Sequence, residues 1–120
     1  MSNRSQFALM LNHAPDRYDG LSEDEFLAII GDYVAWVEEM TREGRYVGGH
    51  KLESLPGRVV SRKGDVIDVH EGPFAELPEV LGGFMIIEAE NFDEAVELAR
   101  NHPHLRHNES MEIRALDPDA

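Results

Sequence analysis

Residues 83–89 read Gly-Phe-Met-Ile-Ile-Glu-Ala, and this stretch decides the fold class. Side chains alternate between the two faces of a β-strand. Phe84 and Ile86 therefore face one side of a predicted strand, and Met85 and Ile87 face the other. A strand with apolar side chains in both directions is typical of a sheet that is covered on both faces.

Residues 6–12, Gln-Phe-Ala-Leu-Met-Leu-Asn, repeat this two-sided apolar pattern and predict a second covered strand. A helix is expected after each of these strands. Ser22 and Glu25 have the spacing of a capping box at the start of a helix that ends at Gly44. Asn91 starts the other helix, which the proline at position 103 ends.

The order of the predicted elements indicates an α+β fold. Further strands are predicted at residues 46–52, 57–62, 65–70 and 110–116. Lys63-Gly64 is the expected two-residue turn between the second and third of these, and Gly48-Gly49 suggest a bulge or a close approach of backbones. We expect one domain over residues 1–120, with an ordered core of about 6–116, folded as a ferredoxin-like β-α-β-β-α-β sandwich.

Two helices can cover only one face of such a sheet, because right-handed crossovers place both on the same side. The other face carries apolar residues of the strands at 6–12 and 83–89. A second copy of the chain is the simplest cover for it. The sequence therefore predicts a homodimer packed sheet face to sheet face, with any pocket at the seam.

Composition excludes several classes of partner. The chain has 11 basic and 24 acidic residues and a formal net charge of −13, which disfavours binding to nucleic acid or to a membrane surface. It has no cysteine, which removes thiolate metal sites and cysteine nucleophiles, and we expect no cofactor and no metal site. The apolar run 7–11 is too short for an export signal or a spanning helix, and we expect a cytoplasmic protein.

An aperiodic segment carries a family resemblance. Residues 71–76, Glu-Gly-Pro-Phe-Ala-Glu, followed by 81–84, Leu-Gly-Gly-Phe, resemble the DGPF motif region of the YCII-related proteins. Matching residues span about 7–116 and include Val47-Gly48-Gly49, Asp93-Glu94-Ala95 and Glu112-Ile113-Arg114. The resemblance implies a dimeric alpha-beta barrel of ferredoxin-like subunits; some members accompany sigma factors of the extracytoplasmic type.

The chain departs from the family pattern. Glu71 stands where the name-giving Asp is expected, Leu77-Pro78 replaces Thr-Lys, and Ala115 replaces Pro. The YciI branch is associated with an enzymatic His-Asp pair, whose Asp corresponds to His102 here. Its His falls in the first helix, and residues 22–44 contain no histidine. The pair therefore does not carry over to this chain.

Three functions remain open. The first is small-molecule binding or an accessory role, with a ligand contacted at the seam by Phe74, Glu76 and Arg114. The second is an enzyme, a lyase, isomerase or hydrolase, that uses a cavity histidine with a carboxylate or Arg114; its candidate catalytic residues are His50, His70 and Glu71. The third is a protein-interaction partner. A segment that only closes the barrel or braces the dimer is the structural alternative for residues 71–83.

The densest group of histidines lies at 102, 104 and 107. Two imidazoles with a carboxylate can hold a divalent metal, but the proline at 103 interrupts the spacing. We expect a solvated loop here, with His102 favoured in its protonated form near a helix C-terminus. Trp36 marks an interface if it lies off the apolar stripe of its helix, and belongs to the core otherwise.

Overall fold

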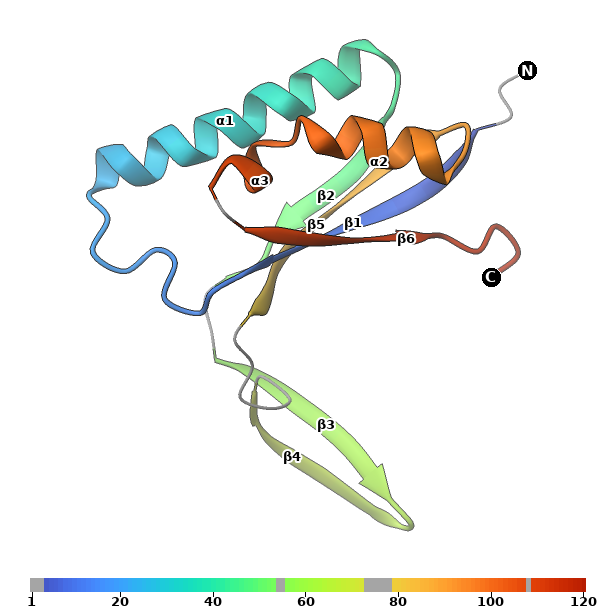
Figure 1. Cartoon of the computed structure of the whole chain (residues 1–120). Helices are drawn as coiled ribbons and strands as arrows, with labels where there is room; N and C mark the ends of the chain where they lie inside the picture. Colours follow the sequence, from blue (N-terminus) through green and yellow to red (C-terminus); the bar gives the residue numbers. More distant parts are fainter. Residues whose placement is uncertain (1–3, 54–55, 73–78, 108) are drawn as a thin grey trace.

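The computed structural model describes residues 4–53, 56–72, 79–107 and 109–120. Figure 1 shows a twisted sheet with the helices on one side and a separate hairpin beyond its end. In chain order the elements are β1 (Ser5–His13), α1 (Glu23–Arg42), β2 (Tyr46–Lys51), β3 (Gly57–Lys63), β4 (Val66–Gly72), β5 (Val80–Ala89), α2 (Phe92–Arg100), α3 (Pro103–Arg106) and β6 (Ser110–Ala115). Among the described residues, no helix combines the length and the apolar character needed to cross a membrane.

The main sheet has the strand order β2-β5-β1-β6, with antiparallel neighbours throughout. With β3 and β4 set aside, this is the order of a ferredoxin-like β-α-β-β-α-β sandwich, and the predicted fold class is confirmed. The two strands set aside pair only with each other. Their turn is one residue later than predicted, because Lys63 pairs with Val66 and Gly64, at a φ of 60°, begins the two-residue loop.

The hairpin β3–β4 protrudes from the body of the molecule (Figure 1). It raises the radius of gyration to 16.5 Å, whereas a compact chain of this length has about 14 Å. Val60 and Val69 pair across it and are 66% and 55% exposed, and Ile67 is 54% exposed. A two-stranded hairpin alone is marginally stable in water. Among the described residues these apolar side chains are largely exposed, and the hairpin pairs with no other strand.

The core lies between the sheet and the helices. Leu9 of β1 and Ile87 of β5 are fully buried there. Trp36 is 7% exposed and contacts the ring of His102. Of the two predicted alternatives, interface or core, Trp36 therefore belongs to the core. The core cluster comprises Phe7, Leu9, Leu11, Trp36, Met40, Met85, Ile87, Ala89 and Ala95.

The opposite side of the sheet faces away from the helices (Figure 1). Alternation along the strands and the strand register place one set of side chains on it. Ala8 is level with Ile86 and Arg114, and Met10 is level with Phe84 and Glu112. We call this side the open face, formed by Ala8, Met10, His50, Phe84, Ile86, Glu112 and Arg114.

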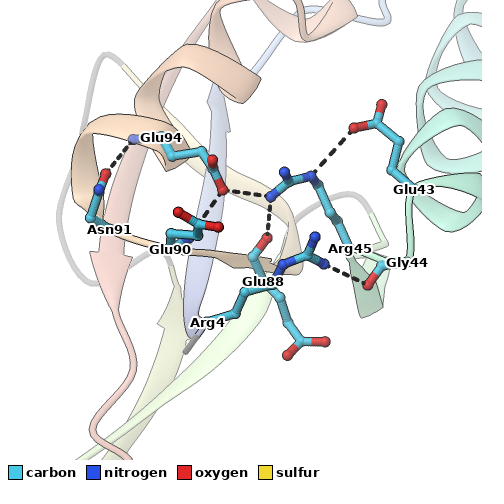
Figure 2. Close-up of polar contacts among 8 residues, drawn as sticks. All are labelled: Arg4, Glu43, Gly44, Arg45, Glu88, Glu90, Asn91 and Glu94. Carbon is cyan, nitrogen blue, oxygen red and sulfur yellow. Dashed lines mark hydrogen bonds and ion pairs between the residues drawn. The ribbon is translucent and has the colours of Figure 1, made fainter. Parts of the chain in front are cut away.

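Arg45 fixes the far end of the two-layer body, where α1, β2, β5 and α2 meet (Figure 2). Its guanidinium donates to Glu94 Oε1 at 2.6 Å, to the carbonyl of Glu88 at 3.2 Å and to Glu43 Oε1 at 3.3 Å. The carboxylates of Glu94 and Glu43 raise the pKa of Arg45, and partial burial acts in the opposite direction. The predicted caps are also present: Ser22 and Glu25 form the capping box of α1, and Asn91 caps α2.

Gly49 is required by a close approach of two strands. A Cβ on Gly49 would stand 2.9 Å from Met85 Cα and still closer to the Phe84 carbonyl oxygen, both on β5. We expect Gly49→Ala to lower the free energy of unfolding by about 1–3 kcal/mol, because the backbone must shift. Gly48→Ala is the matched control, since nothing lies within 4 Å of its Cβ position. Urea denaturation of both variants measures the difference, and equal losses would contradict this account of Gly49.

The prediction for residues 102–107 was wrong. His102 and His104 are 0% and 1% exposed, and the short helix α3 replaces the expected solvated loop. His102 is its N-cap, and its Nδ1 accepts from the backbone N–H of His104 at 3.0 Å. Because both rings are buried among other side chains, the protonated form of His102 is disfavoured rather than stabilised by a helix terminus.

Candidate functional site

A pocket of about 270 Å³ lies between α1 and the helix-facing side of the sheet. The C-terminal half of α1 packs on the sheet through the buried Trp36 and Met40. Ile30, Val34 and Val37, spaced by four and three residues along the same helix, line the pocket instead. The pocket is therefore formed by one chain, mostly on the side of the sheet opposite to the open face, and His50 and Phe84 of the open face also line it.

Apolar side chains and glycines form the pocket wall toward the sheet. Leu11 of β1 and Met85 of β5 contribute side chains, while Gly49 and Gly83 line it with backbone alone. A Cβ on Gly83 would lie 2.9 Å from the carbonyl oxygen of His50, so this strand also needs a glycine at that position. The result is a largely apolar wall, against which a few polar groups at one end can orient a ligand.

The polar end of the pocket is a stack of cations and aromatic rings. The guanidinium carbon of Arg17 lies 5.1 Å from the ring centre of Tyr18 and 5.6 Å from that of Tyr33. Lys51 Nζ lies 5.1 Å from the Tyr18 ring. His13 meets the same ring edge-on with centroids 5.5 Å apart. Cation–π contacts of this kind hold the rings and the charges together at one end of the cavity.

His104 is held by both ring nitrogens. Its Nε2 lies 2.6 Å from the carbonyl oxygen of Asn12 and 2.9 Å from that of Ser110. Carbonyls only accept, so Nε2 carries the proton and Nδ1 is the acceptor. The hydroxyl of Tyr33 donates to Nδ1 at 2.5 Å. The neutral ring is thereby oriented, and Nη1 of Arg17 also approaches its Nδ1, at 3.4 Å.

Burial controls the protonation of these groups. It lowers the pKa of His104, although the two carbonyls act in the opposite direction, and it lowers the pKa of His102 to about 3. It raises the pKa of Tyr33 and of Tyr18, and the Arg17 charge offsets part of both shifts. Near neutral pH the ring of His104 and the hydroxyls of Tyr18 and Tyr33 are therefore uncharged beside the Arg17 guanidinium.

Arg17 is buried with incomplete pairing. Its side chain is 7% exposed, and its Nε lies 3.5 Å from Oε1 of Glu109, which is 12% exposed. Its Nη1 is 3.4 Å from His104 Nδ1. Among the described residues its Nη2 has no hydrogen-bond partner although it is buried.

The residues predicted as site residues lie in several places. His50 lines the pocket rim, and its ring lies against that of Phe84. Arg114 lies on the open face, where its Nη1 is 3.7 Å from Oε2 of Glu112. His70, on the protruding hairpin, contacts Asp68 at 3.0 Å. Glu71 is exposed on the same strand, level with Arg58. Phe74 and Glu76 lie outside the described residues.

Sequence reasoning missed Arg17, Tyr18, Tyr33 and His104. Tyr33 lies on α1 and is partly buried against the core, where a tyrosine usually finds a partner for its hydroxyl. That partner is 71 residues away in the sequence. The signal that could have found the site is Arg17-Tyr18 itself, a cation beside an aromatic residue in the connection between β1 and α1.

Comparison with known proteins agrees with this architecture. A profile of the YCII-related domain matches residues 5–117. The fold and the match define an α+β protein of ferredoxin-like type, and the chain belongs to the YCII-related domain family. A search of curated proteins found no match.

One solved structure resembles the chain over most of its length. It is 5-chloro-2-hydroxyhydroquinone dehydrochlorinase (TftG) from Burkholderia phenoliruptrix AC1100, in complex with 2,5-dihydroxybenzoquinone. The match has a TM-score of 0.50, 14% sequence identity and coverage of 93% of each chain. At this identity the likeness supports the fold.

Proposed function

We propose that this protein binds a small organic molecule in the pocket beneath α1. The observation that carries the proposal is the pocket itself, with apolar walls and a few convergent polar groups at one end. Its volume of about 270 Å³ is just below the range of roughly 300–1,000 Å³ that is common for ligand sites, and it suits a ligand of one ring. The ring-shaped ligand in the TftG structure supports the choice of single-ring probes.

Filling the pocket tests this proposal. Benzoate and benzyl alcohol are suitable probes, and titration calorimetry should detect saturable binding of at least one of them at one site per chain. Ile30→Trp places an indole where Ile30 lines the cavity and should abolish that binding. Leu27→Trp is the control, because Leu27 is 54% exposed on the same helix. Binding that survives Ile30→Trp would place the site elsewhere.

A second candidate is an acid–base enzyme at the same site. It is favoured by the hydrogen bond of 2.5 Å from the Tyr33 hydroxyl to the neutral His104. In this proposal Tyr33 takes a proton from the ligand as its own proton passes to His104 Nδ1. Tyr33→Phe should then abolish turnover while benzoate still binds. A parent protein that converts none of a panel of hydroxylated and halogenated single-ring compounds would contradict the enzyme.

We also propose that the chain forms a homodimer through the open face. Met10, Phe84 and Ile86 lie there away from the helices, and the hairpin adds exposed Val60 and Val69. Two such sheet faces can pack on each other with their strand directions nearly aligned, as in proteins built of two stacked sheets. In that dimer His50 and Arg114 face the seam and stay candidates for a second contact region.

The predicted location in the cytoplasm also remains a proposal. The charged surface, with 29% Asp, Glu, Lys and Arg, supports a protein that stays dissolved at high concentration. Fractionation of cells that produce the tagged protein tests it, and recovery with membranes would contradict it.

A further inference from the structure

We infer that the pocket selects an organic anion with a single flat ring, and that Arg17 binds its negative charge. The inference rests on the proposed function, since it names the class of ligand for the same pocket. Its starting point is a buried cation at the polar end of an otherwise apolar cavity.

The existing partners of Arg17 leave part of its hydrogen-bonding capacity unused. A charge-assisted hydrogen bond between nitrogen and oxygen is normally about 2.7–2.9 Å long. The contacts of Arg17 with Glu109 and His104 are longer, at 3.5 and 3.4 Å. Its Nη2 is buried and has no hydrogen-bond partner among the described residues. Burying a guanidinium with such incomplete pairing is costly, and a carboxylate or phenolate would supply the missing acceptor.

The charges around the pocket agree with an anionic ligand. Arg17 and Lys51 are the cations that line it, and Glu38 is the lining carboxylate. Glu109 lies beside Arg17 and competes with a ligand for the guanidinium. The two positive charges gather at this pocket in a chain whose net charge is −13. Glu38 and Glu109 balance these two charges, so the pocket is near neutral, and an anion meets less repulsion there than over the rest of this acidic chain.

The shape of the polar end favours a flat ring. The Tyr18 and Tyr33 rings both lie within 6 Å of the Arg17 guanidinium. A ring whose acidic group reaches Arg17 would therefore lie among aromatic side chains, in the offset or edge-on contacts that such rings prefer. The Tyr33 hydroxyl already donates to His104, so the guanidinium is the group best placed to recognise the charge.

Paired probes of equal shape test the inference. Benzoate and benzamide differ by the charge, and titration calorimetry should give about tenfold or more tighter binding of benzoate. Equal affinity for the two probes would overturn the anion selectivity and leave the proposed pocket function standing. Failure of both probes and of benzyl alcohol to bind would overturn the two together.

Substitutions then locate the charge recognition. Arg17→Met should weaken benzoate binding about tenfold or more and leave benzamide unchanged. Arg100→Met removes a positive charge at a side chain that is 68% exposed, and should change neither. Glu109→Gln removes the competing carboxylate and should tighten benzoate binding, a test that stands even if Arg17→Met fails to fold. Unchanged benzoate affinity in Glu109→Gln and in a folded Arg17→Met would overturn the role of Arg17.

Discussion

Acidification from about pH 7 to about pH 4.5 is expected to lower the free energy of unfolding by roughly 2–3 kcal/mol through His102 alone. Burial lowers its pKa to about 3 in the folded chain, from the ordinary value of 6.5. The unfolded chain therefore binds the proton more readily between these two values. The stabilising contribution is present above pH 6.5 and is lost as the pH falls toward 3, and His104 acts in the same direction.

Urea denaturation at a series of pH values measures this loss. His102→Asn keeps an acceptor at the N-cap of α3 but removes the titrating group, so stability should vary less with pH over this range. His70→Asn is the matched control, because His70 is half exposed on the hairpin, and it should keep the slope of the parent protein. A parental slope in His102→Asn would show that this buried ring does not control acid stability.

A single acidic substitution on the open face is expected to convert the proposed dimer into a monomer. Ile86→Glu places a carboxylate at the centre of this face, level with Ala8, where a partner sheet would have to bury it. The helix-facing core does not include Ile86, so the monomer should stay folded. Light scattering at micromolar concentration should report twice 13.5 kDa for the parent and 13.5 kDa for the variant.

Leu27→Glu is the control, because it makes the same kind of change, an apolar side chain replaced by a carboxylate, at a site away from the open face. Leu27 is exposed on α1, in the layer on the other side of the sheet, and the variant should remain a dimer. Circular dichroism should show the same secondary structure in all three proteins. A parent protein that is a monomer, or an Ile86→Glu variant that still dimerises, contradicts pairing through the open face.

The fold could be predicted because its signals are local. The two-sided apolar strands at 6–12 and 83–89 became β1 and β5, the two central strands of the sheet. The Ser22 and Glu25 spacing marked the start of α1 directly. Periodicity could not show that β3 and β4 leave the sheet, because a hairpin has the same alternation whether or not other strands flank it.

The pocket was not predictable in the same way. Its polar groups meet through contacts between distant parts of the chain, such as Tyr33 with His104 and Arg17 with Glu109. A histidine-rich stretch beside a proline is usually solvated, and only the packing of Trp36 and Tyr33 against α3 buries it. Sequence reasoning therefore directed the search for a site to the seam between two chains.

Chemical-shift mapping of the labelled protein during titration with benzoate tests the central claim, that the pocket beneath α1 is the binding site. The account predicts saturable shifts of the backbone amides of Tyr33, Gly49 and Gly83, which line that pocket. Shifts confined to Met10 and Arg114 on the open face, or no saturable shifts at all, would contradict it.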